Sequence, residues 1–89
     1  MSREEIIQKQ QAIEDEILAI QRKIVEADVF IFNCEALISR NERTRKRTTS
    51  QMLINSSNRR IEICESRKLR RQKTRIVLDK QLNDKKENY

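Results

Sequence analysis

A heptad repeat of apolar residues runs through the first 38 residues and constrains the fold of this chain more than any other feature. Between Ile6 and Ile38, Gln10 is the one polar a position. The apolar residues at the a and d positions are Ile6, Ile13, Ile17, Ile20, Ile24, Ala27, Ile31, Cys34 and Ile38. Because a and d residues lie on one face of a helix, about five heptads of this pattern predict a long helix with a coiled-coil seam.

A second apolar stripe follows the same stretch of sequence on another face. Its members occupy heptad positions b and f, which lie well over 100° from the seam on a helical wheel. The second stripe consists of Leu18, Val25, Val29, Phe32 and Ala36. A two-stranded coiled coil would leave these side chains in water, so the pattern predicts a bundle of three or more helices.

Helix is the expected structure for the rest of the chain as well. The 89 residues include no Gly and no Pro, and no segment alternates with period two. Ser2 and Glu5 have the spacing of a capping box, which predicts the start of the first helix. Thr48 and Gln51 have the same spacing, which predicts a first helix over 3–42, a turn within 41–48 and a second, basic helix over 49–86.

Two alternatives to this hairpin stay open at the level of the sequence. The polar run 55–58 is a rival position for the turn, because Asn and Ser side chains compete with helical hydrogen bonds. One uninterrupted helix of about 85 residues, roughly 125 Å long, is the other alternative.

Matched arm lengths and charge favour the hairpin. Residues 1–39 hold four basic and eight acidic residues, whereas residues 40–89 hold sixteen basic and six acidic ones. With a turn near residue 45, facing residues would have numbers that sum to about 90. Ile13 would then face Leu78 or Val77, and the acidic run 14–16 would face Lys73 and Arg75.

A helix of this kind cannot persist alone, because burying its apolar side chains yields less than ordering its residues costs. The sequence therefore predicts a single all-α domain in which long-helix coiled-coil hairpins associate into a dimeric four-helix bundle or a higher homo-oligomer. The expected association surface is the isoleucine seam: Ile6, Ile13, Ile17, Ile20, Ile24, Ile31 and Ile38.

Basic residues carry the strongest functional signal. The chain has 20 Lys and Arg against 14 Asp and Glu, and six of the nine residues 67–75 are basic. Arg presents a planar fork of donors that fits phosphate, so we expect binding to duplex or structured nucleic acid without sequence specificity. The candidate residues are Arg43, Arg45, Lys46, Arg47, Arg59, Arg60, Arg67, Lys68, Arg70, Arg71, Lys73 and Arg75.

Stacking of bases on aromatic rings is not expected, because Phe30, Phe32 and Tyr89 lie outside the basic segments. The basic arm has an alternative partner in acidic protein, which would make the chain a structural or scaffold subunit of a larger helical assembly.

Composition argues against catalysis and against cofactors. Without His the chain lacks the commonest acid–base group and metal ligand, and Cys34 and Cys64 form no metal-binding pair. We therefore expect no enzyme, no cofactor and no metal site. The N-terminus does not resemble a signal peptide and no stretch is long enough for a membrane span, so we expect a protein of the cytoplasm or nucleus.

Overall fold

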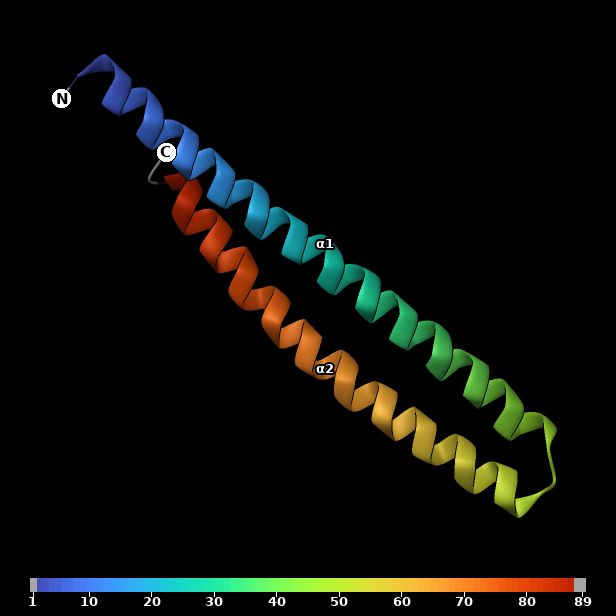
Figure 1. The fold of residues 1–89 in the computed structure, drawn as a ribbon. Coiled ribbons are helices and arrows are strands. Elements are labelled where there is room, and N and C mark those ends of the chain that lie inside the picture. Colours follow the sequence, from blue (N-terminus) through green and yellow to red (C-terminus); the bar gives the residue numbers. More distant parts are fainter. Residues whose placement is uncertain (1, 88–89) are drawn as a thin grey trace.

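The computed structural model is an antiparallel hairpin of two long helices (Figure 1). Of the 89 residues, the structure describes 2–87. Helix α1 runs over Arg3–Arg47, helix α2 runs over Gln51–Glu87, and the non-helical residues 48–50 join them. The Cα atoms extend over 73 × 14 × 13 Å, so the chain reverses direction instead of forming one helix of about 125 Å. The all-α hairpin predicted from the helix caps, the matched arms and the charge distribution is confirmed.

The turn lies later in the chain than the sequence predicts. Helix α1 continues beyond residue 42 through the basic run and ends at Arg47, and the turn occupies 48–50 instead of 41–48. Three cations, Arg45, Lys46 and Arg47, fill the last turn of α1. Cations at the C-terminal end of a helix are stabilised by its dipole, which explains why this run stays helical. Helix α2 consequently covers 51–87 and not 49–86.

The two predicted helix caps have different outcomes. The Ser2 hydroxyl accepts the Glu5 N–H at 3.2 Å, so the first cap is confirmed. The cap predicted at Thr48 is wrong, because Thr48 terminates α1 and its N–H donates to the Thr44 carbonyl. The Thr48 hydroxyl instead accepts the Ser50 N–H at 3.1 Å and tightens the turn. The rival turn at 55–58 is helical.

The heptad seam of α1 packs against α2 of the same chain. The residues buried along it are Ile24, Ala27, Cys34 and Asn41 from α1, with Ser57, Ile61, Cys64 and Leu78 from α2. Several of them are small, and within residues 2–87 no large side chain falls below 2% exposure. The hairpin therefore has a narrow core that is open along both edges.

Ion pairs between the helices fix their register. The numbers of each pair of partners sum to 101 or 103, so facing residues have numbers that sum to about 102. These pairs are Glu16–Lys85, Asp28–Arg75 and Glu35–Lys68.

The register expected from the sequence is therefore wrong by about twelve. Leu78 lies beside Ala27 and not beside Ile13, and Arg75 pairs with Asp28 and not with the acidic run 14–16. Moving a turn by one residue shifts an antiparallel register by two. The turn lies about four residues later than expected, which accounts for most of the difference.

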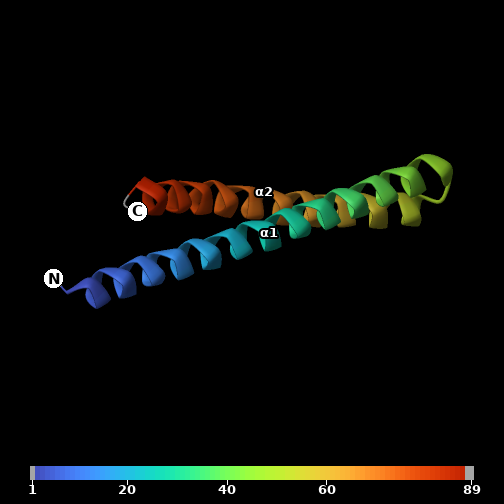
Figure 2. The same ribbon diagram turned by 90° about the horizontal axis from the view of Figure 1, so that it is seen from above.

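The shifted register leaves the beginning of α1 without a facing helix. Both ribbon views show the N-terminal end of α1 projecting past the C-terminal end of α2 (Figures 1 and 2). Glu16 pairs with Lys85 close to the last described turn of α2, so residues 3–13, here called the overhang, extend beyond it. Ile6 and Ile7 in the overhang are 45% and 44% exposed.

Candidate nucleic-acid interface

Three cations of α2 occupy seam positions that would otherwise hold apolar residues. Because the seam is open at its edges, each side chain bends out of it towards a partner. Lys68 pairs with Glu35 at 3.3 Å, and Arg75 pairs with Asp28 and with Asp79. These contacts satisfy Lys68 and Arg75 within the chain.

The third seam cation, Arg71, bends to the opposite edge of the seam. Its guanidinium carbon lies 4.6 Å from the centre of the Phe30 ring, a cation–π distance. The ring supports the guanidinium on one face and leaves its N–H donors at the surface. Phe30 therefore contributes to the basic surface although it lies outside the basic segments of the sequence and belongs to the other helix. Tyr89 lies outside the described residues.

The pKa of Arg75 is raised above its ordinary value. The largest cause is the hydrogen bond that the guanidinium donates to Asp28, followed by the Coulomb attraction of Asp28 and then of Asp79. Both carboxylates hold Arg75 at the edge where Lys68 meets Glu35, away from Arg71. In the middle of the hairpin, one edge thus carries the ion pairs of Asp28 and Glu35, and the other edge carries Arg71.

Arginines gather in two shallow depressions. One is lined by Arg40, Arg43, Thr44 and Arg47 next to the turn, and the other by Phe30, Arg67, Arg70, Arg71 and Thr74. Thr44 follows Phe30 by two heptads, and residues two heptads apart lie on the same side of a coiled-coil helix. Both depressions therefore open on the same side of the hairpin.

Arg60 belongs to the same side, because it precedes Arg67 by one heptad. We call this surface the arginine face and define it by Arg40, Arg43, Arg47, Arg60, Arg67, Arg70 and Arg71. With the observed register, Arg71 lies at the level of residue 31 of α1. The arginine face therefore extends over about 16 residues of helix, or roughly 24 Å.

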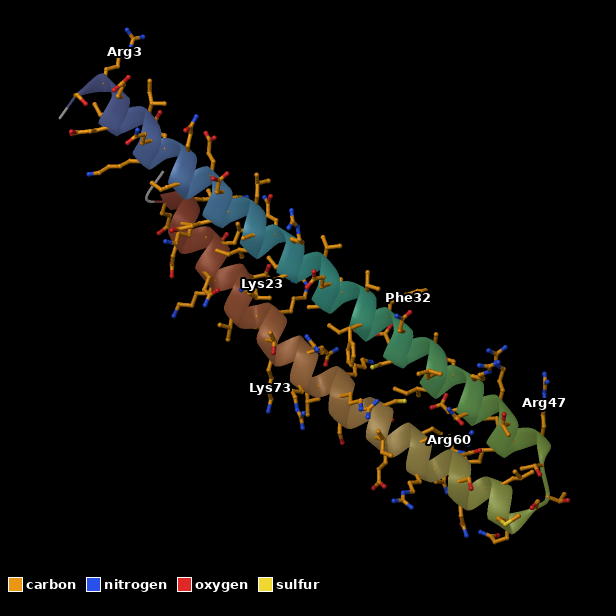
Figure 3. The ribbon with its side chains drawn as sticks, viewed as in Figure 1. Arg3, Lys23, Phe32, Arg47, Arg60 and Lys73 are labelled. Carbon is orange, nitrogen blue, oxygen red and sulfur yellow. The ribbon has the colours of Figure 1, made fainter. Side chains whose placement is uncertain are left out.

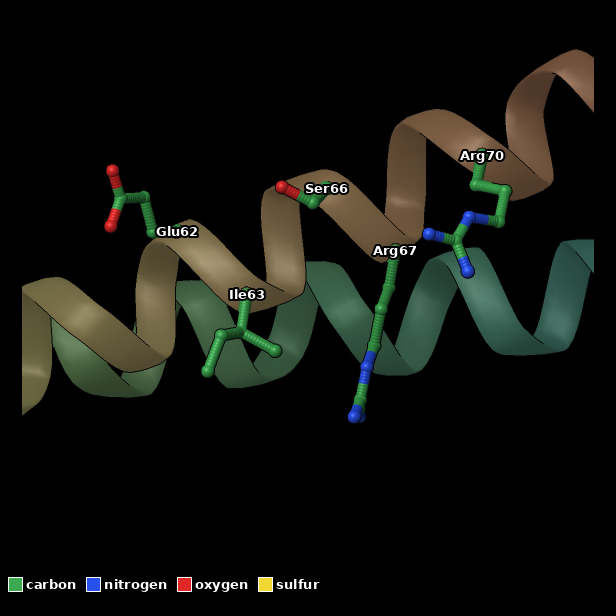
Figure 4. A pocket seen from close by; sticks show the side chains of 5 residues that line it. All are labelled: Glu62, Ile63, Ser66, Arg67 and Arg70. Atoms are coloured by element: carbon green, nitrogen blue, oxygen red, sulfur yellow. The ribbon is translucent and has the colours of Figure 1, made fainter.

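Two carboxylates border the arginine face. Glu62 lines a shallow depression together with Arg67 and Arg70, although Figure 4 shows its carboxylate turned away from the two guanidinium groups. Glu26 lines a further depression with Arg71. Glu35 is drawn to Lys68 at the ion-paired edge. Among residues 2–87, the four ion pairs include no member of the arginine face. The seven guanidinium groups thus form a predominantly basic surface with Glu26 and Glu62 at its border.

The structure separates the twelve cations predicted to bind nucleic acid into three groups: members of the arginine face, residues with a partner in the chain, and residues that point outwards. Six belong to the arginine face: Arg43, Arg47, Arg60, Arg67, Arg70 and Arg71. Lys68 and Arg75 are ion-paired, and Arg45 donates to Asn58 at 2.9 Å across the helices. The other three point outwards from positions b and f: Lys46, Arg59 and Lys73. Figure 3 shows Lys73 at the edge of α2 that faces away from α1.

Sequence reasoning missed Arg40 and Phe30. Arg40 begins the run 40–47, three residues before Arg43, and its spacing of seven from Arg47 was a usable signal. Phe30 could not be found without the register, because its contact with Arg71 joins residues 41 positions apart.

The isoleucines expected to form the association surface lie along the seam within one chain. Ile24 is buried, the overhang residue Ile6 is exposed, and the remaining five are half-buried: Ile13, Ile17, Ile20, Ile31 and Ile38. Helix α2 covers most of this seam, so the large apolar side chains of α1 that remain most exposed are those of the second stripe.

Comparison with protein-family models, with curated proteins and with solved structures finds no match to this chain. Within the described residues, neither α1 nor α2 contains an apolar stretch of the length that crossing a membrane requires. The fold and its surface chemistry are therefore the basis for a functional proposal.

Proposed function

We propose that this chain binds double-stranded nucleic acid through the phosphate backbone, without reading the base sequence, and that it does so as a homo-oligomer inside the cell. The observation that supports this most strongly is the arginine face, on which seven guanidinium groups share one side of the hairpin. The role is that of a binding protein and not of an enzyme.

The dimensions of the arginine face suit a duplex. Each guanidinium offers a fork of N–H donors that fits two phosphate oxygens. The face is about 24 Å long, which corresponds to roughly seven base pairs at 3.4 Å each. With the observed register, Arg60 of α2 lies level with residue 42, among the arginines of α1, whereas Arg67 and Arg70 lie level with residues 35 and 32. The arginines of the two helices therefore follow one another along the face and can contact successive phosphates.

Contacts within the hairpin help to separate the arginine face from acidic residues and to position Arg71. Lys68 and Arg75 neutralise acidic residues at the other edge and thereby keep those carboxylates away from the arginine face. Arg71 is held by Phe30, so less side-chain freedom is lost when it meets a phosphate. The remaining arginines are exposed, and their contacts are long-range and sensitive to salt.

The proposal is tested by removing three charges from the face and three from elsewhere on the same helix. The face variant changes Arg67, Arg70 and Arg71 to Gln. The control variant changes three outward-pointing cations to Gln: Arg59, Lys73 and Lys80. Both variants lose the same net charge and keep good helix formers. Binding to unrelated 20-base-pair duplexes is measured by fluorescence anisotropy at several salt concentrations.

We expect the face variant to bind all duplexes about equally weakly and to flatten the salt dependence by up to about three units, one per lost phosphate contact. The control variant should lose much less affinity for the duplexes. Equal losses in the two variants would show that net charge and not the arginine face determines binding.

A scaffold function is the second candidate, because the basic helix demonstrably meets carboxylates. Lys68, Arg75 and Lys85 each pair with an acidic residue of α1. In this function the arginine face would dock on an acidic protein surface of a larger assembly. It becomes the preferred explanation if the wild-type chain fails to bind both duplex and single-stranded nucleic acid at low salt.

A further inference from the structure

The second stripe is the largest apolar surface that the hairpin leaves uncovered on α1. Leu18 is 58% exposed, Val25 60%, Val29 54% and Phe32 69%, and Ala36 is exposed as well. Figure 3 shows Phe32 at the edge of α1 that faces away from α2. Between residues 18 and 36, Arg22 is the one charged b or f residue.

We propose that the second stripe is the dimer interface, and that it packs against the second stripe of another copy of this chain in antiparallel orientation. This deepens the homo-oligomer part of the proposed function by naming the surface. A twofold axis near residue 27 brings b positions opposite f positions whose numbers sum to 54. Leu18 then meets Ala36 of the other copy, and Val25 meets Val29.

The same arrangement gives Arg22, the one charged residue at these positions, a partner that suits it. Phe32 of one copy faces Arg22 of the other, and an Arg side chain can cover an aromatic ring with its stem while its guanidinium stays in water. Leu18 thus faces the smaller Ala36, Val25 faces Val29 of equal size, and the Arg22 cation faces an aromatic ring. The stripe is therefore complementary to itself, which an interface with twofold symmetry requires.

The size of the surface sets the expected affinity. Residues 18–36 cover about 27 Å of helix, and one helix is roughly 10 Å wide. Contact along such a strip buries several hundred Å² per copy, below the ~800 Å² per partner of a standard interface. We therefore expect a dissociation constant on the order of 1–100 µM. The narrow core of the single hairpin gives the chain a reason to associate.

A second copy fits this surface better than nucleic acid does. The second stripe lies at positions b and f of α1, whereas Arg40 and Arg47 of the arginine face lie at position c. Arg43 occupies position f but lies one heptad beyond Ala36, the last residue of the stripe. The contact over residues 18–36 thus leaves the arginine faces of both copies open. Binding of nucleic acid and formation of the dimer can therefore be measured separately.

Sedimentation equilibrium of the wild-type chain and two variants tests the interface. Val29→Glu places a charge in the second stripe, and Val77→Glu makes the same change on α2, where Val77 is 55% exposed against 54% for Val29. We expect wild type and Val77→Glu to form dimers at 100 µM, and Val29→Glu to dissociate at least tenfold more readily. A monomeric wild type, or equal effects of the two substitutions, overturns the proposal.

Cross-linking then tests the orientation without depending on a disruptive variant. Glu26→Cys lies next to the twofold axis and should cross-link to its copy with a short bismaleimide reagent. Gln11→Cys should not, because antiparallel copies hold the two residues about 50 Å apart. The wild type measures any background from the buried Cys34 and Cys64. Efficient cross-linking at both sites would indicate a parallel dimer and overturn the assignment.

The two proposals fail in different ways. A monomeric chain that still binds duplexes contradicts the dimer alone. A dimer that binds no nucleic acid leaves the interface in place and contradicts the nucleic-acid function.

Discussion

Replacing Leu78 by Ala should destabilise the hairpin far more than the same change at Leu69. Both leucines belong to α2, but Leu78 is 8% exposed in the seam and Leu69 is 54% exposed on the outer surface. Removing a buried Leu side chain costs about 2–5 kcal/mol, depending on how well the site can collapse. Because the seam is open along both edges, we expect the lower end, about 2–3 kcal/mol. Replacing the exposed Leu69 by Ala should lower the free energy of unfolding by less than about 1 kcal/mol.

Thermal unfolding followed by circular dichroism at one fixed protein concentration measures the difference. For a domain of this size, each kcal/mol lowers Tm by roughly 4–8 °C. Leu78→Ala should therefore lower Tm by about 8–24 °C, and Leu69→Ala by less than about 8 °C. The concentration is held fixed because association makes Tm depend on it. Equal shifts in the two variants would refute the seam and the register that places Leu78 in it.

Three further predictions follow from the register and the helix ends. Spin labels at Lys23 and Gln81, which line one depression, should lie about 10–15 Å apart, and more than 25 Å would contradict the register. Lys68→Leu should raise Tm by a few degrees, because an apolar side chain replaces a cation at a seam position; a lower Tm would contradict this. Ser2→Ala should speed amide hydrogen exchange within the overhang, residues 3–13, without changing Tm, since the described part of α2 ends before it. A lower Tm would mean that the overhang is covered.

The regular features of this fold could be predicted from local sequence. The isoleucine heptads fix the face of α1 that meets α2, and the Ser2 cap marks where α1 begins. Both depend on residues within one turn or one heptad of each other, for which the physical rules are strong.

The position of the turn could not be predicted in the same way. Without Gly or Pro, Thr48 was the best stop signal, but a Thr can end one helix as well as begin the next. The basic residues before it stabilise the last turn of α1 instead of breaking it. An error of four residues in the turn then became a larger error in the register.

Which basic residues belong to the candidate site could not be predicted for the same reason, because it depends on the register. Arginines such as Arg67 and Arg70 were identified from composition alone, but their separation from Lys68 and Arg75 depends on which acidic residues of α1 lie opposite. Asp28 and Glu35 draw those two cations to one edge, and Phe30 draws Arg71 to the other. This sorting is a property of the packed helix pair and not of the basic helix itself.

The salt dependence of duplex binding by the wild-type chain tests the central claim most directly. Each phosphate contact with duplex DNA contributes about −0.9 to the slope of log affinity against log salt concentration, so seven arginines set a limit near −6. If the arginine face binds the backbone, the slope should lie between about −4 and −6 and should not change with the duplex sequence. A slope between 0 and about −1, or no binding at about 50 mM salt, would contradict the account.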